Sequence, residues 1–154
     1  MTEADERART LEVSRVVNAP RDLVFEVFST ARHIDQWWGP DGFRNETHSM
    51  DFSVGGLWHY TMHGPDGKAW PNWIRYRLIE RPARLVYDHG GELSEPAHFH
   101  GEITFEEEGR HTRVTLRLVF PSLEAVETAK SYGAVAGGQQ TLARLDAYLA
   151  ERGT

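Results

Sequence analysis

The sequence predicts an α+β domain in which a curved antiparallel sheet of about seven strands wraps around a long C-terminal helix. Short stretches of alternating apolar and polar residues follow one another through the middle of the chain, as is typical of strands with one buried face. Residues 122–150 instead repeat their apolar side chains at helical spacing. Because one long helix is available, we expect it to cover the apolar face of the sheet.

The first part of the chain predicts a tail, a strand and two short helices. Residues 1–8 are polar and charged and are expected to form a disordered tail, so that a single domain spans residues 9–152. Residues 9–17 alternate apolar and polar side chains and predict the first strand. An apolar stripe at helical spacing in residues 21–30 predicts a helix, and a second short helix is expected at residues 31–38.

Six further strands are expected before the C-terminal helix. Glycine, proline and aspartate between them supply the turns. The expected strands span residues 46–52, 57–63, 70–80, 85–89, 98–106 and 112–120. Arg75 and Arg77 are expected to face water, whereas a register shifted by one residue would turn them inward and favour an anionic ligand.

The C-terminal helix carries an unusual number of glycines in its middle. Ser122 is a suitable N-cap, and the helix is expected to run on to residue 150. Gly133, Gly137 and Gly138 each cost about 1 kcal/mol relative to alanine in a helix. A kink or close packing against a strand would explain them, and room for a ligand is the alternative.

Composition excludes several classes of function. The formal net charge is −6 and the basic residues are interleaved with acidic ones, which argues against a nucleic-acid partner. The chain has no cysteine, so disulfides and thiolate chemistry are excluded. No segment reaches the length of a membrane span, and the charged N-terminus does not resemble a secretory signal. The expected location is therefore the cytoplasm.

Several short motifs follow one another along the chain. They are WWGPDGF at 37–43, HSMD at 48–51, GGLW at 55–58, MHGPDG at 62–67, PARLVY at 82–87 and GGQQTL at 137–142. In this order they resemble the motifs of the SRPBCC superfamily, which has the START-like, helix-grip fold of the birch-pollen allergens. More closely, the chain resembles the branch named for the activator of heat-shock protein 90 ATPase, from about residue 9 to residue 149.

The resemblance implies a cavity between the sheet and the C-terminal helix. Members of the superfamily bind hydrophobic small molecules, and some are cyclases or aromatases. The co-chaperone that gives the branch its name carries an additional N-terminal domain, which this sequence does not contain. The family name therefore does not by itself indicate chaperone activation.

Aromatic residues are concentrated between Trp37 and Tyr76, and they point to a binding pocket. Gln140 is of interest because a buried amide needs hydrogen-bond partners in the protein or in a ligand. A solvent-facing or fully satisfied amide is an equal alternative. The predicted wall residues are Trp38, Phe43, His48, Met50, Trp58, Tyr60, Met62, Tyr76 and Phe99 from the sheet and loops, with Tyr132, Ala136 and Gln140 from the helix.

Eight histidines raise the question of a metal site. His98 and His100 alternate with Phe99, so strand parity predicts that both face outward, as do His59 and His63. No sequence motif of zinc ligands accompanies them, and we expect neither a metal nor a cofactor. No nucleophilic serine motif or phosphate-binding loop is present either.

The sequence therefore predicts a protein that binds a hydrophobic or aromatic small molecule between the sheet and the C-terminal helix. A stress-related co-chaperone is one alternative, with a chaperone as its partner. A cyclase or hydrolase acting on a polyketide-like substrate is another, for which His48 and Tyr60 would be the acid and base candidates. A homodimer is compatible with each of these functions.

Overall fold

A seven-stranded antiparallel sheet is the central element of the described part of the chain, which is residues 3–152 of this computed structural model. Its strands pair in the order β1-β7-β6-β5-β4-β3-β2. The elements in chain order are α1 (Glu3–Ala8), β1 (Thr10–Val17), α2 (Arg21–Ser29), α3 (Ala31–Ile34), β2 (Arg44–Met50), β3 (Leu57–His63), β4 (Ala69–Glu80), β5 (Arg84–Gly90), β6 (Phe99–Glu108), β7 (His111–Val119), α4 (Leu123–Ser131) and α5 (Ala134–Arg152).

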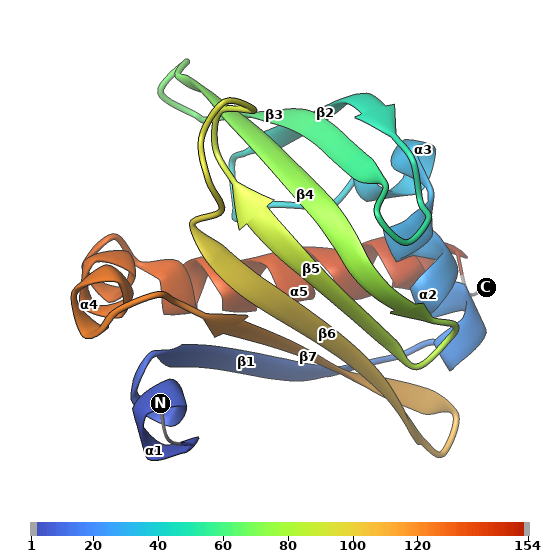
Figure 1. Cartoon of the computed structure of the whole chain (residues 1–154). Coiled ribbons are helices and arrows are strands. Elements are labelled where there is room, and N and C mark those ends of the chain that lie inside the picture. Colours follow the sequence, from blue (N-terminus) through green and yellow to red (C-terminus); the bar gives the residue numbers. More distant parts are fainter. Residues whose placement is uncertain (1–2, 153–154) are drawn as a thin grey trace.

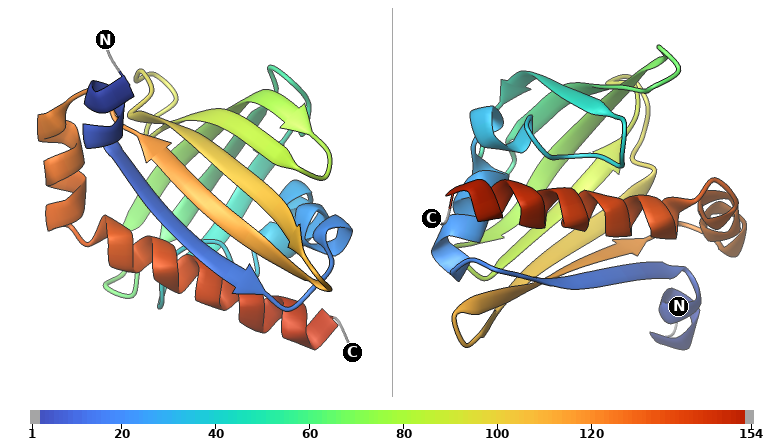
Figure 2. Two further views of the ribbon diagram at one scale, coloured as in Figure 1. Left: turned by 90° about the horizontal axis from the view of Figure 1, so that it is seen from below. Right: turned by 180° about the vertical axis from the view of Figure 1, so that it is seen from behind.

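The sheet is strongly curved, and α5 lies across its concave side (Figure 1). Helices α2 and α3 cover the same side near the end of the molecule where α5 terminates (Figure 2). The predicted helix-grip architecture, with two short helices after the first strand, is confirmed.

The core lies between the concave face and these three helices. Leu142, Leu145 and Leu149 of α5 are fully buried, as their helical spacing predicts. Phe25 and Phe28 of α2 pack edge to face on Phe105 of β6, with ring centroids 5.2 and 5.1 Å apart. The second half of α5 is therefore the part that closes the core.

Two predictions about the ends of the chain differ from the structure. Residues Glu3–Ala8 form the short helix α1, within the stretch 1–8 where a disordered tail was expected, and residues 1–2 lie outside the described residues. The predicted continuous C-terminal helix is divided into α4 and α5. The division falls at Gly133, whose φ of +83° is a left-handed conformation that ends a helix and that glycine adopts without strain.

A second glycine of this region allows α5 to approach the sheet. A Cβ atom added to Gly138 would lie 2.9 Å from Cγ2 of Val13 on β1, which is closer than normal van der Waals contact. At the neighbouring Gly137 the nearest atom to an added Cβ is Pro40 Cβ, at 3.7 Å. Close packing against a strand therefore explains Gly138, and a helix break explains Gly133.

The two adjacent glycines provide a matched test of this packing. We expect Gly137→Ala to raise the free energy of unfolding by about 0.5–1 kcal/mol, because alanine is the better helix former. Gly138→Ala gains the same propensity but has to displace Val13, so it should be less stable than Gly137→Ala by about 1 kcal/mol or more. Urea titrations of both variants measure the difference, and equal stabilisation would contradict the close contact.

Candidate ligand-binding site

Aromatic side chains fill the middle of the concave face. Trp58 and Tyr60 of β3 are buried and stack at 3.9 Å between ring centroids. Trp38 packs edge to face on Trp58 at 5.7 Å. The cavity that remains beside Trp38, Trp58 and Tyr76 is only about 10 Å³, which is at most the space of one water molecule. A large closed cavity, as the resemblance implied, is therefore not found at this position.

An open groove of about 450 Å³ lies instead at the other end of β3 and β4. We call it the β3–β4 groove. Its walls are mostly apolar, and its one charged side chain, Asp66, lies in the hairpin turn, where it accepts a hydrogen bond from the backbone N–H of Lys68 at 3.0 Å. The lining residues are Pro40, Phe43, Met62, Pro65, Asp66, Trp70 and Asn72.

Helix α5 holds one wall of this groove in place. The Arg144 guanidinium donates to the carbonyl oxygens of Gly39 and Pro40 at 2.9 and 3.0 Å. Gln140 Oε1 accepts from the backbone N–H of Asp41 at 3.1 Å. Gln140 is thus an amide satisfied by the protein through its oxygen, and it fixes the loop that carries Phe43. Burial lowers the pKa of Arg144, with Asp41 acting in the opposite direction.

Asn72 places an oriented amide at the groove. Its side chain is buried, Nδ2 donates to the carbonyl oxygen of Trp70 at 2.9 Å, and Oδ1 lies 2.9 Å from Nε2 of His89. With Nδ2 already a donor, Oδ1 accepts from His89 and Nε2 carries the proton. The His89 ring in turn stacks on Phe99, with centroids 4.5 Å apart and planes 11° apart.

Four buried titratable side chains of the concave face, His89, Tyr60, Tyr76 and Tyr87, are neutral. Burial, with a smaller contribution from His98, lowers the pKa of His89 to about 3. Burial also raises the pKa values of Tyr60, Tyr76 and Tyr87 far above the ordinary value. Nδ1 of His89 is a buried acceptor without a hydrogen-bond partner. The interior therefore offers hydrogen bonds but no formal charge from these four residues.

A β-bulge in β2 decides which of its side chains face the interior. The register shifts between Thr47 and Ser49, so Thr47 pairs with Tyr60 and Met50 with Trp58. His48 is left on the outer face, where Nε2 lies 2.7 Å from Oγ1 of Thr61. Strict alternation had placed His48 and Met50 on one face. The extra residue of the bulge breaks that alternation.

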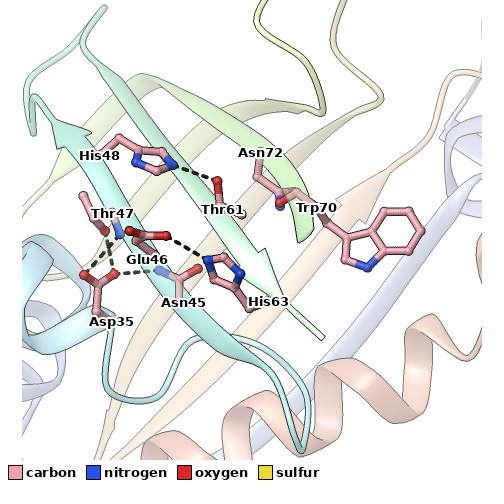
Figure 3. Close-up of polar contacts among 9 residues, drawn as sticks. All are labelled: Asp35, Asn45, Glu46, Thr47, His48, Thr61, His63, Trp70 and Asn72. Carbon is pink, nitrogen blue, oxygen red and sulfur yellow. Dashed lines mark hydrogen bonds and ion pairs between the residues drawn. The ribbon is translucent and has the colours of Figure 1, made fainter. Parts of the chain in front are cut away.

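A partly buried polar network ties this part of β2 to the end of α3. Asp35 accepts hydrogen bonds from Asn45 Nδ2 at 2.8 Å and from the Thr47 hydroxyl at 2.6 Å. The Thr47 oxygen accepts from the Trp58 indole at 3.0 Å. Figure 3 shows the Asp35 contacts and the outer contacts of His48 and His63, with the Trp70 ring apart from both.

The predicted wall residues are distributed over several environments. Phe43 and Met62 line the β3–β4 groove. Gln140 is half-buried and accepts a hydrogen bond from the backbone N–H of Asp41 in the loop beside this groove. Phe99 is half-buried and stacks on His89, but it lines a different groove. Trp58, Tyr60 and Tyr76 are core residues, with Trp38 and Met50 packed against them. His48, Tyr132 and Ala136 are exposed and are not brought together with the others.

Four residues that shape the site, namely Trp70, Asn72, His89 and Arg144, were not among the predicted wall residues. Trp70 and Asn72 share strand parity with Tyr76, and His89 shares it with Tyr87, so the alternation that selected Tyr76 could also have selected them. Arg144 carries no sequence signal for its role, because its partners are backbone carbonyls of a distant loop.

Charged side chains of β4 face outward as expected. Arg77 is exposed and pairs with Asp88 at 2.5 Å, and Arg75 donates to the carbonyl oxygen of Gly55 at 2.8 Å. Among residues 3–152, no group of three or more His, Asp or Glu side chains is arranged to hold a metal ion. None of the helices in that range has the length and apolarity that a membrane crossing requires.

The family profile described as "Activator of Hsp90 ATPase homolog 1-like protein" matches residues 18–150. The chain belongs to this family. A search of curated proteins finds no match to the sequence.

Solved structures with the same fold include several bacterial proteins. A Mycobacterium smegmatis protein is 24% identical with a TM-score of 0.87, covering 96% of this chain and 95% of the other. An Arthrobacter aurescens protein is 27% identical with a TM-score of 0.87, covering 96% and 89%. A Nitrosomonas europaea protein is 19% identical with a TM-score of 0.85, covering 94% and 96%. The chain therefore spans nearly the full length of these structural neighbours.

The buried His89 should make the stability of this family member pH-dependent. The ring has an ordinary pKa of 6.5 when unfolded and a pKa of about 3 when folded. Between these values the unfolded chain binds a proton that the folded chain does not. His89 therefore lowers the free energy of unfolding as pH falls through this window, by up to about 1.4 kcal/mol per pH unit.

Denaturant titrations between pH 4 and pH 7 test this expectation. His89→Phe should unfold with a flatter dependence on pH, whatever its stability at neutral pH. His111→Phe, at an exposed histidine, should keep the original slope. Equal slopes for the original chain and His89→Phe would contradict a neutral buried His89.

Proposed function

We propose that this protein binds a small, uncharged molecule with an aromatic body in the β3–β4 groove. The observation that carries the proposal is the pair Trp70 and Asn72, which occupy successive inward positions of β4 beside the groove. One supplies an exposed aromatic surface and the other a buried hydrogen-bonding group whose orientation is held by the fold.

The groove's shape and walls support an aromatic ligand. The Trp70 side chain is 52% exposed, and Phe43 and Met62 lie in the same walls. Rings of this kind gain affinity by stacking and by contact with a methionine sulfur. A volume of about 450 Å³ falls in the range of ordinary small-molecule sites.

The polar groups support a ligand without charge. The Asn72 amide donates one N–H to the Trp70 carbonyl and accepts one hydrogen bond from His89. One N–H and one lone pair of the amide therefore remain for a ligand. His89 is neutral, so a buried ion would lose its hydration without gaining a counter-charge from it. A hydroxyl or carbonyl on the ligand would match the capacity of Asn72.

Binding of 2-naphthol, compared with 2-methylnaphthalene, tests both parts of the proposal. We expect 2-naphthol to bind more tightly, and Trp70→Ala to weaken its binding about tenfold or more through lost stacking. Asn72→Leu should remove the preference for 2-naphthol, because it removes the amide. Fluorine NMR of protein labelled with 5-fluorotryptophan reports directly on the Trp70 ring during the titration.

Val54→Ala is the matched control, since Val54 is exposed and lies outside the groove. It should bind both probes as the original chain does. If neither probe shifts the Trp70 resonance, or if Trp70→Ala binds 2-naphthol unchanged, the proposed site is wrong.

The family description favours a second candidate function, stimulation of a chaperone ATPase. Tyr132 and Leu123, next to and within α4, are 87% and 58% exposed and would suit a protein partner. This function predicts that the purified chain stimulates the ATPase of a bacterial heat-shock protein 90, and that Tyr132→Ala reduces the effect. No stimulation at a large molar excess would reject it.

A further inference from the structure

A second groove lies on the opposite, outer face of the sheet, and its chemistry differs from that of the β3–β4 groove. Its volume is about 530 Å³. We call it the outer groove. The end of α1 forms one wall, the segment before β6 forms another, and Val86 of β5 and Val119 of β7 contribute apolar surface. Figure 1 shows α1 and α4 at this end of the molecule, away from the C-terminus.

Strand pairing places the charged side chains of this groove. His100 of β6 pairs with Asp88 on one side and with Val119 on the other. One step along the same face, Glu102 pairs with Val86 and with Arg117. Because paired residues share a face, these side chains surround the two valines on the outer side.

Cationic groups outnumber anionic ones along these walls. Three guanidinium groups, those of Arg9, Arg84 and Arg117, line the groove together with two carboxylates. The chain as a whole has a net charge of −6, so the groove reverses the overall sign. Both carboxylates are already bridged: Glu6 Oε1 lies 3.0 Å from Arg117 Nη2, and Glu102 Oε2 lies 2.7 Å from Arg84 Nε.

The guanidinium groups retain donors beyond these bridges. An arginine has five N–H groups, and each bridge uses only part of them. The Arg84 Nε atom lies close to Glu102 without hydrogen-bond geometry, and it is buried without a hydrogen-bond partner. Arg84 and Arg117 therefore keep the capacity to bind an additional anion.

His100 is held in a fixed orientation beside them. Asp88 has a side chain only 10% exposed, and its Oδ1 lies 2.5 Å from His100 Nδ1. Its Oδ2 is bound by Arg77, also at 2.5 Å. With Nδ1 engaged, Nε2 is the ring nitrogen that can meet a ligand, and the His100 side chain is 69% exposed. A protonated ring donates from Nε2 to an anion.

We propose that the outer groove is a binding site for a small organic anion, a molecule that carries a carboxylate or phosphate on an apolar body. The apolar body lies over Val86 and Val119, and the acid group is bound by His100, Arg84 and Arg117. The site is separate from the β3–β4 groove and does not depend on the function proposed for it.

Calorimetric titration with benzoate and phenyl phosphate tests the proposal, with benzyl alcohol as the uncharged counterpart. We expect at least one acid to bind about tenfold or more tightly than benzyl alcohol, because charge-assisted hydrogen bonds are available only to the acids. Which acid binds better identifies carboxylates or phosphates as the preferred class. Arg84→Gln and His100→Gln should each weaken that binding about fivefold or more.

Arg113→Gln is the control, because Arg113 lies on the same sheet, pairs with Glu108 and does not line the groove. Amide NMR spectra of each variant establish that it is folded, and shifts at Val86 and His100 locate the ligand. Binding of benzyl alcohol as tight as that of both acids would overturn the proposal. So would equal losses in Arg113→Gln and Arg84→Gln, or inorganic phosphate binding as tightly as the better acid.

Discussion

The contact between Gly138 and Val13 sets how the rest of the molecule is arranged. At this point α5 comes close enough to β1 that a single added carbon would crowd a valine side chain. From there the helix continues with Leu142, Leu145 and Leu149 in the core. The same orientation carries Gln140 and Arg144 to the loop after α3, which they bind through its backbone. The position of α5 thus determines which part of the concave side is packed core and which part stays open as the β3–β4 groove.

The aromatic core explains why the open β3–β4 groove lies at one end of the concave side and not in its middle. Trp58, Tyr60 and Tyr76 occupy the concave face where a large cavity was expected, and α2 and α3 cover the same side. Burial of large aromatic rings gives a strong stabilising contribution, so this half of the concave side is a packed core. Beyond it, β3 and β4 extend past the helices, and their inward side chains face the β3–β4 groove.

The two faces of the sheet differ in their electrostatics. Inside, His89 and the buried tyrosines are neutral because an ion would lose its hydration there. Outside, arginine, histidine and carboxylate side chains form ion pairs along β5, β6 and β7. Successive residues of a strand point to opposite faces of the sheet. Asp88 therefore lies on the outer face beside His100, and its neighbour His89 lies on the inner face beside Asn72.

The sequence by itself determined the fold class, the strand order along the chain and the apolar stripe of α5, whereas it left the direction of Arg75 and Arg77 open between two registers. These features follow from local periodicity and turn chemistry, and a family resemblance carried by short motifs supported them.

Tertiary structure decided which side chains form the site. A one-residue bulge turned His48 outward while leaving Met50 inward, and the periodicity of the sequence does not predict a bulge. Whether the concave side holds a cavity or a packed core depends on how closely α5 approaches the sheet. The hydrogen bond between Asn72 and His89 joins residues 17 positions apart, and that between Arg144 and Gly39 joins residues 105 positions apart, so only the folded molecule brings these partners together.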